Sequence, residues 1–236
     1  MGKLNLQIIL LLLFIQILSI SIWAQNTKKQ QGKKGKPCGE LTVKYAEKTY
    51  HTVQIGDQCW LKENLDAGTM IKSEKAEDNQ ADNKIIEKYC YNNDPANCET
   101  YGGLYQWNEA MQYITDTVRN VGVQGICPAG WHIPTYSEFE ALMEAVGRSG
   151  DALKAVAQET GKKTSGFSAL NAGERDGQDG KFRKLEGKWR ETGFWSTLGG
   201  DLSTALIITG TYDNIKRSSY NKATGFSVRC IKDSAV

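Results

Sequence analysis

The sequence predicts an α+β fold in which short antiparallel strands at both ends of the chain enclose two or three helices. Alternating and β-branched runs occur near the two ends, whereas helical spacing occurs only between about residues 108 and 158. The chain also contains six cysteines, an even number. In an exported chain such a set indicates a disulfide-stapled fold, although spacing alone leaves the pairing open.

The N-terminus predicts export. Lys3 supplies a small positive charge, residues 8–18 are almost wholly aliphatic, and small or polar residues lead to Ala24. This is the order of a secretory signal peptide, so we expect residues 1–24 to be removed and no membrane span to remain. An uncleaved anchor is the alternative, but polar residues interrupt the apolar run. We therefore expect a secreted, cell-surface or periplasmic protein.

A lysine-rich segment follows at residues 25–37, and its glycines and glutamines are typical of a solvated linker. A tether to a membrane surface or a polyanion is the other interpretation. The formal net charge is only +2, and the rest of the chain without this segment is mildly acidic. Because no basic surface remains, we expect no nucleic-acid partner. Residues 38–233 then form a single domain.

Strand patterns begin this domain. Residues 42–45 alternate, and residues 49–55 are rich in β-branched and aromatic side chains. Gly56-Asp57 separates them from residues 58–61, which predicts a hairpin with a two-residue turn. Residues 64–83 are polar and weakly patterned, so we expect an exposed loop.

Turn-forming residues are dense around Cys90 and Cys98. A bridge between these two cysteines would staple a short loop and stabilise it by about 2.5 kcal/mol. A helix is expected from residue 108 to 117, with Ala110, Met111 and Ile114 on one face.

The clearest helix signal begins at Thr135. Thr135 and Glu138 have the spacing of a capping box, and Gly147 marks the end. Apolar residues recur between them at helical spacing, at Phe139, Leu142, Met143 and Val146. A shorter helix is expected over residues 151–158.

The remaining chain predicts strands separated by turns, with candidates at 182–189, 193–197, 202–209, 217–220 and 225–231. The loop at 173–180 is rich in glycine and acidic residues. Asp176 and Asp179 place oxygens at a spacing that hard cations use, but the loop lacks the remaining ligands of an EF-hand. We interpret it as an exposed turn and expect no cofactor, with calcium as the alternative.

Four segments stand in one order: Val53–Leu65, Tyr101–Asn108, Gly125–Pro134 and Gly225–Ile231. In this order they resemble the Fibrobacter succinogenes major paralogous domain, a family of exported proteins common in Bacteroidetes and Fibrobacteres. The resemblance covers roughly residues 38 to 233. It implies a fold similar to that of C-type lectins, in which the N-terminal and C-terminal strands lie together. It implies little about activity, because the role of the family is largely undefined.

The resemblance also implies a disulfide pairing. Lectin-like domains join a cysteine near the first helix to one in the last strand, which implies Cys127–Cys230. If Cys90 and Cys98 form the local bridge, Cys38–Cys59 is the third pair of this implied set. The calcium motifs of lectins do not carry over, because neither Glu-Pro-Asn nor Trp-Asn-Asp occurs in the sequence.

Catalytic patterns are sparse. Cys127 and His132 suggest a nucleophile and its base, but the cysteine has a disulfide partner in the implied pairing. His132 is more simply a packed residue with a hydrogen-bonded ring. Metal-protease, phosphate-loop and serine-elbow motifs do not occur.

Aromatic side chains mark a candidate ligand surface, because sugar rings stack on aromatic planes while amides and carboxylates bond the hydroxyls. We expect this surface at Trp189, Tyr212, Asp213 and Asn214. Three other tryptophans are expected in the core, namely Trp107, Trp131 and Trp195.

Together these features predict an exported, non-catalytic binding module whose extracellular ligand is a glycan, a surface polymer or a protein. One alternative is a cysteine-dependent oxidase related to formylglycine-generating enzymes, which needs two reduced or redox-active cysteines. Another is a structural component of a cell-surface assembly.

Overall fold

The computed structural model describes residues 36–114, 122–155, 164–183, 191–200, 202–209 and 213–234. Residues from Cys38 onward form one compact unit. The expected signal peptide and nearly all of the lysine-rich linker lie outside the described residues. Within the described ranges, no helix has both the length and the apolar composition needed to cross a membrane.

The largest sheet has five strands in the order β1-β2-β3-β12-β6. Their bounds are β1 (Thr42–Tyr45), β2 (Lys48–Ile55), β3 (Gln58–Leu61), β12 (Ile231–Lys232) and β6 (Trp131–His132). The predicted hairpin is confirmed, since β2 and β3 pair antiparallel around Gly56, whose φ is +55°. Strand β12 pairs with both β3 and β6, so the first and last strands of the domain share one sheet.

The C-terminal half contributes a three-stranded sheet in the order β11-β10-β9. Its strands are β9 (Glu191–Gly199), β10 (Ser203–Thr209) and β11 (Ile215–Tyr220). Two small pairs complete the strands, β4 (Thr69–Met70) with β5 (Glu87–Lys88) and β7 (Glu174–Arg175) with β8 (Phe182–Arg183).

Two of the expected C-terminal strands differ from the prediction. Of residues 182–189, the first two form β8, and residues 184–190 lie outside the described residues. Of residues 225–231, Gly225, Phe226 and Ser227 form isolated bridges to three different segments. A regular strand begins only at Ile231, because the chain there crosses from the edge of β9 to the five-stranded sheet.

The helices are short, and most lie in the middle of the chain: η1 (Tyr91–Asn93), α2 (Pro95–Tyr101), α3 (Trp107–Ala110), α4 (Tyr136–Ala145) and α5 (Gly150–Leu153). The predicted capping box is confirmed at the start of α4. Thr135 accepts a hydrogen bond from the backbone of Glu138, and Glu138 accepts one from the backbone of Thr135. Gly147, with φ of +63°, follows the end of this helix as predicted.

The prediction of a helix over residues 108–117 was wrong for the part that the structure describes, and residues 115–117 lie outside it. Helix α3 ends at Ala110, because Gln112 and Tyr113 adopt left-handed backbone angles with φ of 52° and 58°. Ala110 and Met111 are buried as expected, but Ile114 is 46% exposed. The expected helix over 151–158 also ends early, at Leu153, where Lys154 forms a bridge with Ala169, and residues 156–158 lie outside the described residues.

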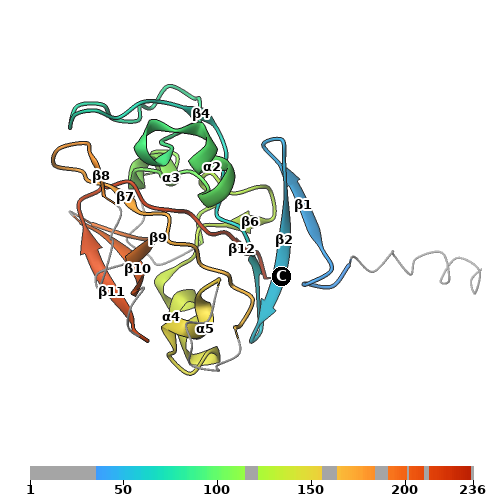
Figure 1. The fold of residues 1–236 in the computed structure, drawn as a ribbon. Coiled ribbons are helices and arrows are strands. Elements are labelled where there is room, and N and C mark those ends of the chain that lie inside the picture. The colour runs from blue at the N-terminus through green and yellow to red at the C-terminus, as the bar shows by residue number, and fades with distance from the viewer. Residues whose placement is uncertain are drawn as a thin grey trace, which may run out of the picture. The chain divides into compact units, whose positions relative to one another are not determined.

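Two hydrophobic clusters pack against opposite faces of the five-stranded sheet. Adjacent residues of a strand point to opposite faces, and Trp60 and Leu61 at the end of β3 accordingly enter different clusters. Trp60 stacks on Phe139 of α4, and the same cluster reaches Leu206 of β10. In Figure 1, α4 and α5 lie between β2 on one side and β10 with β11 on the other.

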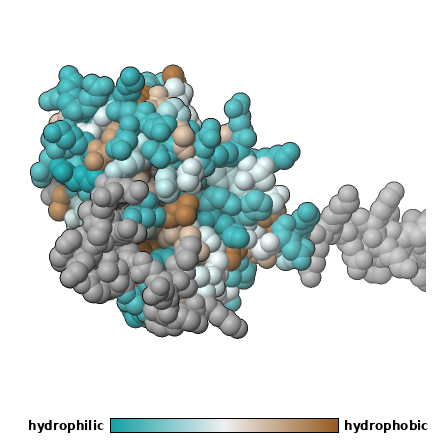
Figure 2. Space-filling model, in the orientation of Figure 1, coloured by the Kyte–Doolittle hydropathy of each residue, from teal (hydrophilic) through white to brown (hydrophobic). Residues whose placement is uncertain are grey.

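The tryptophans expected in the core are buried, with exposed fractions of 2% for Trp107, 4% for Trp131 and 0% for Trp195. All three belong to the cluster on the Leu61 side. The described part of the face in Figure 2 is mostly hydrophilic, with hydrophobic residues in small patches. The apolar side chains of the domain are thus largely collected in its core.

The segment at residues 64–83 was expected to be an exposed loop, and this was wrong for several of its residues. Asn64, Asp66, Ser73 and Gln80 are buried. Gln80 shows why: its side-chain oxygen accepts from the backbone of Gln106, and its backbone donates to the side chain of Gln106. Polar side chains in this segment bond neighbouring backbone groups, so polar composition does not mean exposure here.

The six cysteines form the disulfides Cys38–Cys59, Cys90–Cys98 and Cys127–Cys230, the pairing stated above, and no cysteine is free. The first ties the N-terminal segment to β3, and the second staples α2. The third joins residues 103 apart in the sequence and brings the chain before β6 to the end of the domain. Disulfides of this kind indicate an oxidising compartment, outside the cell or in the periplasm.

His132 lies in a clamp of two carboxylates. Its Nε2 is 2.9 Å from Glu138 Oε1 and its Nδ1 is 2.7 Å from Asp233 Oδ1. Burial lowers the pKa of His132, but the hydrogen bonds to Glu138 and Asp233 outweigh it, so the pKa lies above the ordinary value of 6.5. The packed, hydrogen-bonded histidine that the sequence predicted is therefore confirmed, and it links α4 to the segment after β12.

This clamp predicts a pH-dependent stability. Because the folded pKa is raised, its stabilisation is complete below about pH 6.5 and is lost as the pH rises through the folded pKa. We expect the urea midpoint to fall between about pH 6 and pH 9, and His132→Gln to remove most of that slope. His51→Gln is the control and should retain the slope. An equal slope in the wild-type protein and in the His132 variant would contradict the prediction.

Candidate functional site

A cleft of about 350 Å³ is the candidate functional site. It lies between the N-terminal half of β2, the segment that follows β3, the C-terminal end of α2 and residues 168–170. Charged, hydroxyl and aromatic side chains line it together. Its lining combines hydrogen-bonding groups with an apolar surface of somewhat greater area, which is a usual composition of a small-ligand site.

Asn64 forms the floor of the cleft and holds two of its walls together. Its amide nitrogen donates to the backbone oxygen of Tyr101 at 2.8 Å and to Ser227 Oγ at 3.2 Å. The α2 wall comes very close here, since a Cβ built on Gly102 would lie 2.6 Å from Cβ of Asn64. Gly102 also has φ of +82°, so glycine satisfies both the backbone angle and the contact.

Arg229 lies directly behind this floor and is 0% exposed. Its Nε donates to Asn64 Oδ1 at 3.2 Å, and its Nη1 donates to the backbone oxygens of Leu61 and Phe167. The guanidinium also faces the rings of Phe167 and Phe194. In the described residues no carboxylate bonds it. Burial lowers the pKa of Arg229 to about 9, so the group is cationic at neutral pH.

Asp66 forms a second charged group beside the cleft. This nearly buried carboxylate lies 2.7 Å from Lys48 Nζ and 2.5 Å from Lys88 Nζ. Lys48 also donates to the backbone oxygens of Cys98 and Glu99 at the end of α2. These bonds connect β2 with α2 and give the cleft a preformed wall.

Some charged side chains of the cleft have hydrogen-bond partners within the protein, and others have none among the described residues. Glu63 accepts from the backbone nitrogen of His51, and its second oxygen lies 2.9 Å from His51 Nδ1. By contrast, the side chains of Lys62 and Glu99 have no hydrogen-bond or ion-pair partner among the described residues. Tyr101, partly buried, adds an aromatic ring to the same cleft. Lys62, Glu99 and Tyr101 are therefore the side chains available to a ligand.

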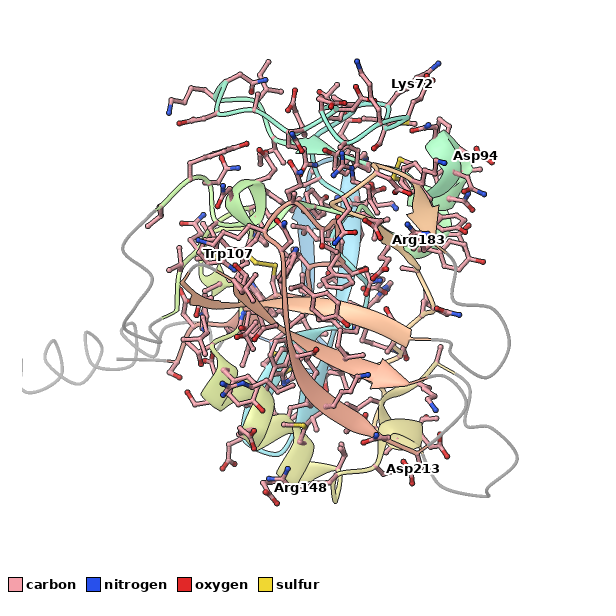
Figure 3. All side chains as sticks on the ribbon, turned by 90° about the vertical axis from the view of Figure 1, so that its left-hand side faces the viewer. Lys72, Asp94, Trp107, Arg148, Arg183 and Asp213 are labelled. Carbon is pink, nitrogen blue, oxygen red and sulfur yellow. A yellow bond between two sulfur atoms is a disulfide. The ribbon has the colours of Figure 1, made fainter. Side chains whose placement is uncertain are left out.

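The ligand surface expected from the sequence does not coincide with this cleft. Trp189 and Tyr212 lie outside the described residues, and Asp213 and Asn214 do not line the cleft. Asp213 Oδ1 instead accepts from Ser149 Oγ at 2.8 Å and from the backbone of Asp151 at 3.0 Å. It therefore supports the start of α5. Figure 3 shows Asp213 near the Arg148 end of the molecule, far from Asp94 at the start of α2.

The expected cation candidates bond a side chain of the protein instead. Asp176 Oδ2 lies 2.7 Å from Arg183 Nε, and Asp179 Oδ2 lies 2.9 Å from Arg183 Nη2. Arg183 thus forms ion pairs with both carboxylates of the turn between β7 and β8. Across the described ranges, no group of three or more metal-ligating side chains comes together.

The cleft was not predicted from the sequence, although two of the four motif segments supply residues to its lining. Lys62, Glu63 and Asn64 belong to Val53–Leu65, while Tyr101 and Gly102 belong to Tyr101–Asn108. Polar residues that recur inside otherwise apolar motif segments were the available signal. Only the fold brings the two segments side by side.

The fold and the cleft define a disulfide-bonded α+β protein of an oxidising compartment with a preformed cleft. The chain belongs to the Fibrobacter succinogenes major domain family, whose model matches residues 53–232. No curated protein and no solved structure matches the chain.

Proposed function

We propose that this protein is an exported, non-catalytic binding module and that the cleft around Asn64 holds its ligand. The observation that carries this proposal is the preformed cleft of about 350 Å³ with uncommitted Lys62, Glu99 and Tyr101 in its lining. Its volume lies near the lower end of the range of small-ligand sites, about 300–1,000 Å³. A ligand of one or two sugar rings, free or at the end of a polymer, suits such a space.

The state of the cysteines favours binding over catalysis. A cysteine-dependent oxidase needs two reduced or redox-active cysteines, whereas all six cysteines are paired. The other catalytic candidate, His132, has carboxylates on both ring nitrogens, and its neighbour Cys127 is bonded to Cys230. A thiol count on the denatured, exported protein tests this part of the proposal, and free thiols would contradict it.

We also propose that the domain is related in architecture to C-type lectins. The pairing of β12 with β3, which places the terminal strands in one sheet, supports this relation. The Cys127–Cys230 bond, from the segment before α4 to the end of the chain, supports it as well. We further propose that the residues before the domain act as a cleaved leader and a spacer, as the exported binding module requires.

The proposed function predicts that Tyr101→Ala weakens ligand binding about fivefold or more, because stacking on an aromatic ring contributes about 1–3 kcal/mol. The measurement is binding of the purified protein to a panel of soluble polysaccharides, with and without Ca²⁺. Tyr136→Ala is the matched control, a partly buried tyrosine on α4 outside the cleft. Equal loss in both variants, or binding by neither the wild-type protein nor the variants, would contradict the proposal.

The same purified protein can distinguish a binding module from a structural component of a surface assembly. A monomer in solution that binds a saccharide supports a binding module. Concentration-dependent self-association without saccharide binding would favour the assembly component instead.

A further inference from the structure

We infer that the cleft selects a sugar unit that carries a carboxylate, such as a uronic acid of an acidic polysaccharide. This inference rests on the proposed binding function of the cleft and names the chemistry of its ligand. Three features carry it: an uncommitted ammonium in the lining, a buried guanidinium behind the floor, and the partners of the neighbouring carboxylates.

Lys62 supplies the direct contact. It follows the end of β3 and is partly buried, and its ammonium has no hydrogen-bond or ion-pair partner in the part of the chain that the structure describes. An ammonium beside a carboxylate forms a charge-assisted hydrogen bond, which is stronger than one between neutral groups. Lys48, the other lysine of the cleft, is already bonded to Asp66 and to two backbone oxygens of α2.

Arg229, which lies behind Asn64, adds a positive electrostatic potential to the cleft. Its guanidinium touches Asn64 on the floor and the backbone oxygen of Phe167, the residue before Ser168 in the cleft wall. Its described hydrogen-bond partners are neutral amide and backbone oxygens. The charge of Glu63 acts on this guanidinium, although no described carboxylate bonds it. A buried charge without a bonded counter-ion acts across low-dielectric walls, and a cleft focuses that field on its occupant.

The negative groups near the cleft reduce this field, but none of the described ones bonds Arg229. Glu63, which also lines the cleft, is hydrogen-bonded to His51, and Asp66 is shared by Lys48 and Lys88. Glu99 is the exception, an exposed carboxylate in the lining without a partner among the described residues. Its charge opposes an acidic ligand, so its removal should increase affinity.

The same surroundings favour a sugar over an acidic peptide. Extended peptides commonly bind by adding a strand to a free sheet edge. The strand beside the cleft, β2, is paired with β1 on one side and with β3 on the other. Hydroxyl groups from Thr49, Thr100 and Ser168 and the ring of Tyr101 surround the space instead.

The decisive experiment compares an acid with its neutral ester. Calorimetric titration of the purified exported protein would use oligogalacturonate and alginate oligosaccharides, each as the free acid and as the methyl ester. A neutral glucan and oligoglutamate complete the set. We expect at least one acid to bind about tenfold or more tightly than its ester, because esterification removes the charge and keeps the ring.

Charge-changing variants test the assignment to this cleft. Lys62→Gln should weaken binding of the acid about tenfold and binding of the ester much less, whereas Glu99→Gln should strengthen binding of the acid several-fold. Lys44→Gln is the control, an exposed lysine of β1 outside the cleft. An equal effect of Lys62→Gln and Lys44→Gln would overturn the assignment.

The remaining outcomes separate the inference from the proposed function. Equal binding of acid and ester, or binding of the neutral glucan alone, would overturn the inference and leave a binding module. Oligoglutamate that binds as tightly as the acidic sugars would overturn the choice of a sugar. Failure of every compound to bind would remove the proposed function together with the inference.

Discussion

Replacement of both Cys127 and Cys230 with alanine is expected to lower the free energy of unfolding by about 4.5 kcal/mol. The bridge joins positions 103 residues apart, and in the chain-entropy model a cross-link restricts the unfolded chain more when it closes a longer loop. Both residues are buried, so alanine avoids a buried hydroxyl. Urea unfolding of the purified protein measures the change.

The matched control is the double replacement of Cys90 and Cys98, which are separated by only eight residues. The same model gives this shorter loop about 2.5 kcal/mol. A loss for the Cys127–Cys230 pair no larger than that for the Cys90–Cys98 pair would show that closure of the terminal strands does not dominate stability.

The second large effect is expected for Arg229→Lys, which should lower the free energy of unfolding by about 3 kcal/mol. A single ammonium on a shorter chain cannot reach Asn64 and the backbone oxygens of Leu61 and Phe167 at once. At least one buried acceptor would lose its partner, while the cost of a buried charge would stay. Unfolding in urea, with the slope m unchanged, measures this loss.

Arg148→Lys is the control for Arg229→Lys. Arg148 is exposed and pairs with Glu140 and Glu144 on α4, where either cation can serve. Surface pairs of this kind contribute about 0–1 kcal/mol. Similar losses for the two variants would contradict a special role of the buried guanidinium.

Local signals predicted several elements correctly. The Gly56-Asp57 turn between β-rich runs predicted the β2–β3 hairpin, and the spacing of Thr135 and Glu138 predicted the start of α4. Both depend on contacts between residues close in the sequence. The segment between Cys90 and Cys98 is similar, since its bridge closes a loop of a few residues.

Predictions failed where distant contacts decide the conformation. Residues 108–117 have helical spacing, yet α3 stops where Gln112 and Tyr113 turn into left-handed conformations. At that point Ala110 accepts a hydrogen bond from Ile126. Residues 64–83 look like a solvent loop, yet Gln80 is buried against Gln106. Such partners are invisible to periodicity, which describes neighbours along the chain only.

The sequence by itself determined that the domain is α+β, cysteine-rich and a member of its family, because composition, turns, caps and ordered motifs are properties of short segments. Only the tertiary structure decided where the cleft lies. Asn64 and Arg229 are far apart in the chain, and they meet because β12 enters the sheet beside β3. A polar side chain becomes a cleft floor or a solvated surface group according to what folds against it, and that is a long-range property.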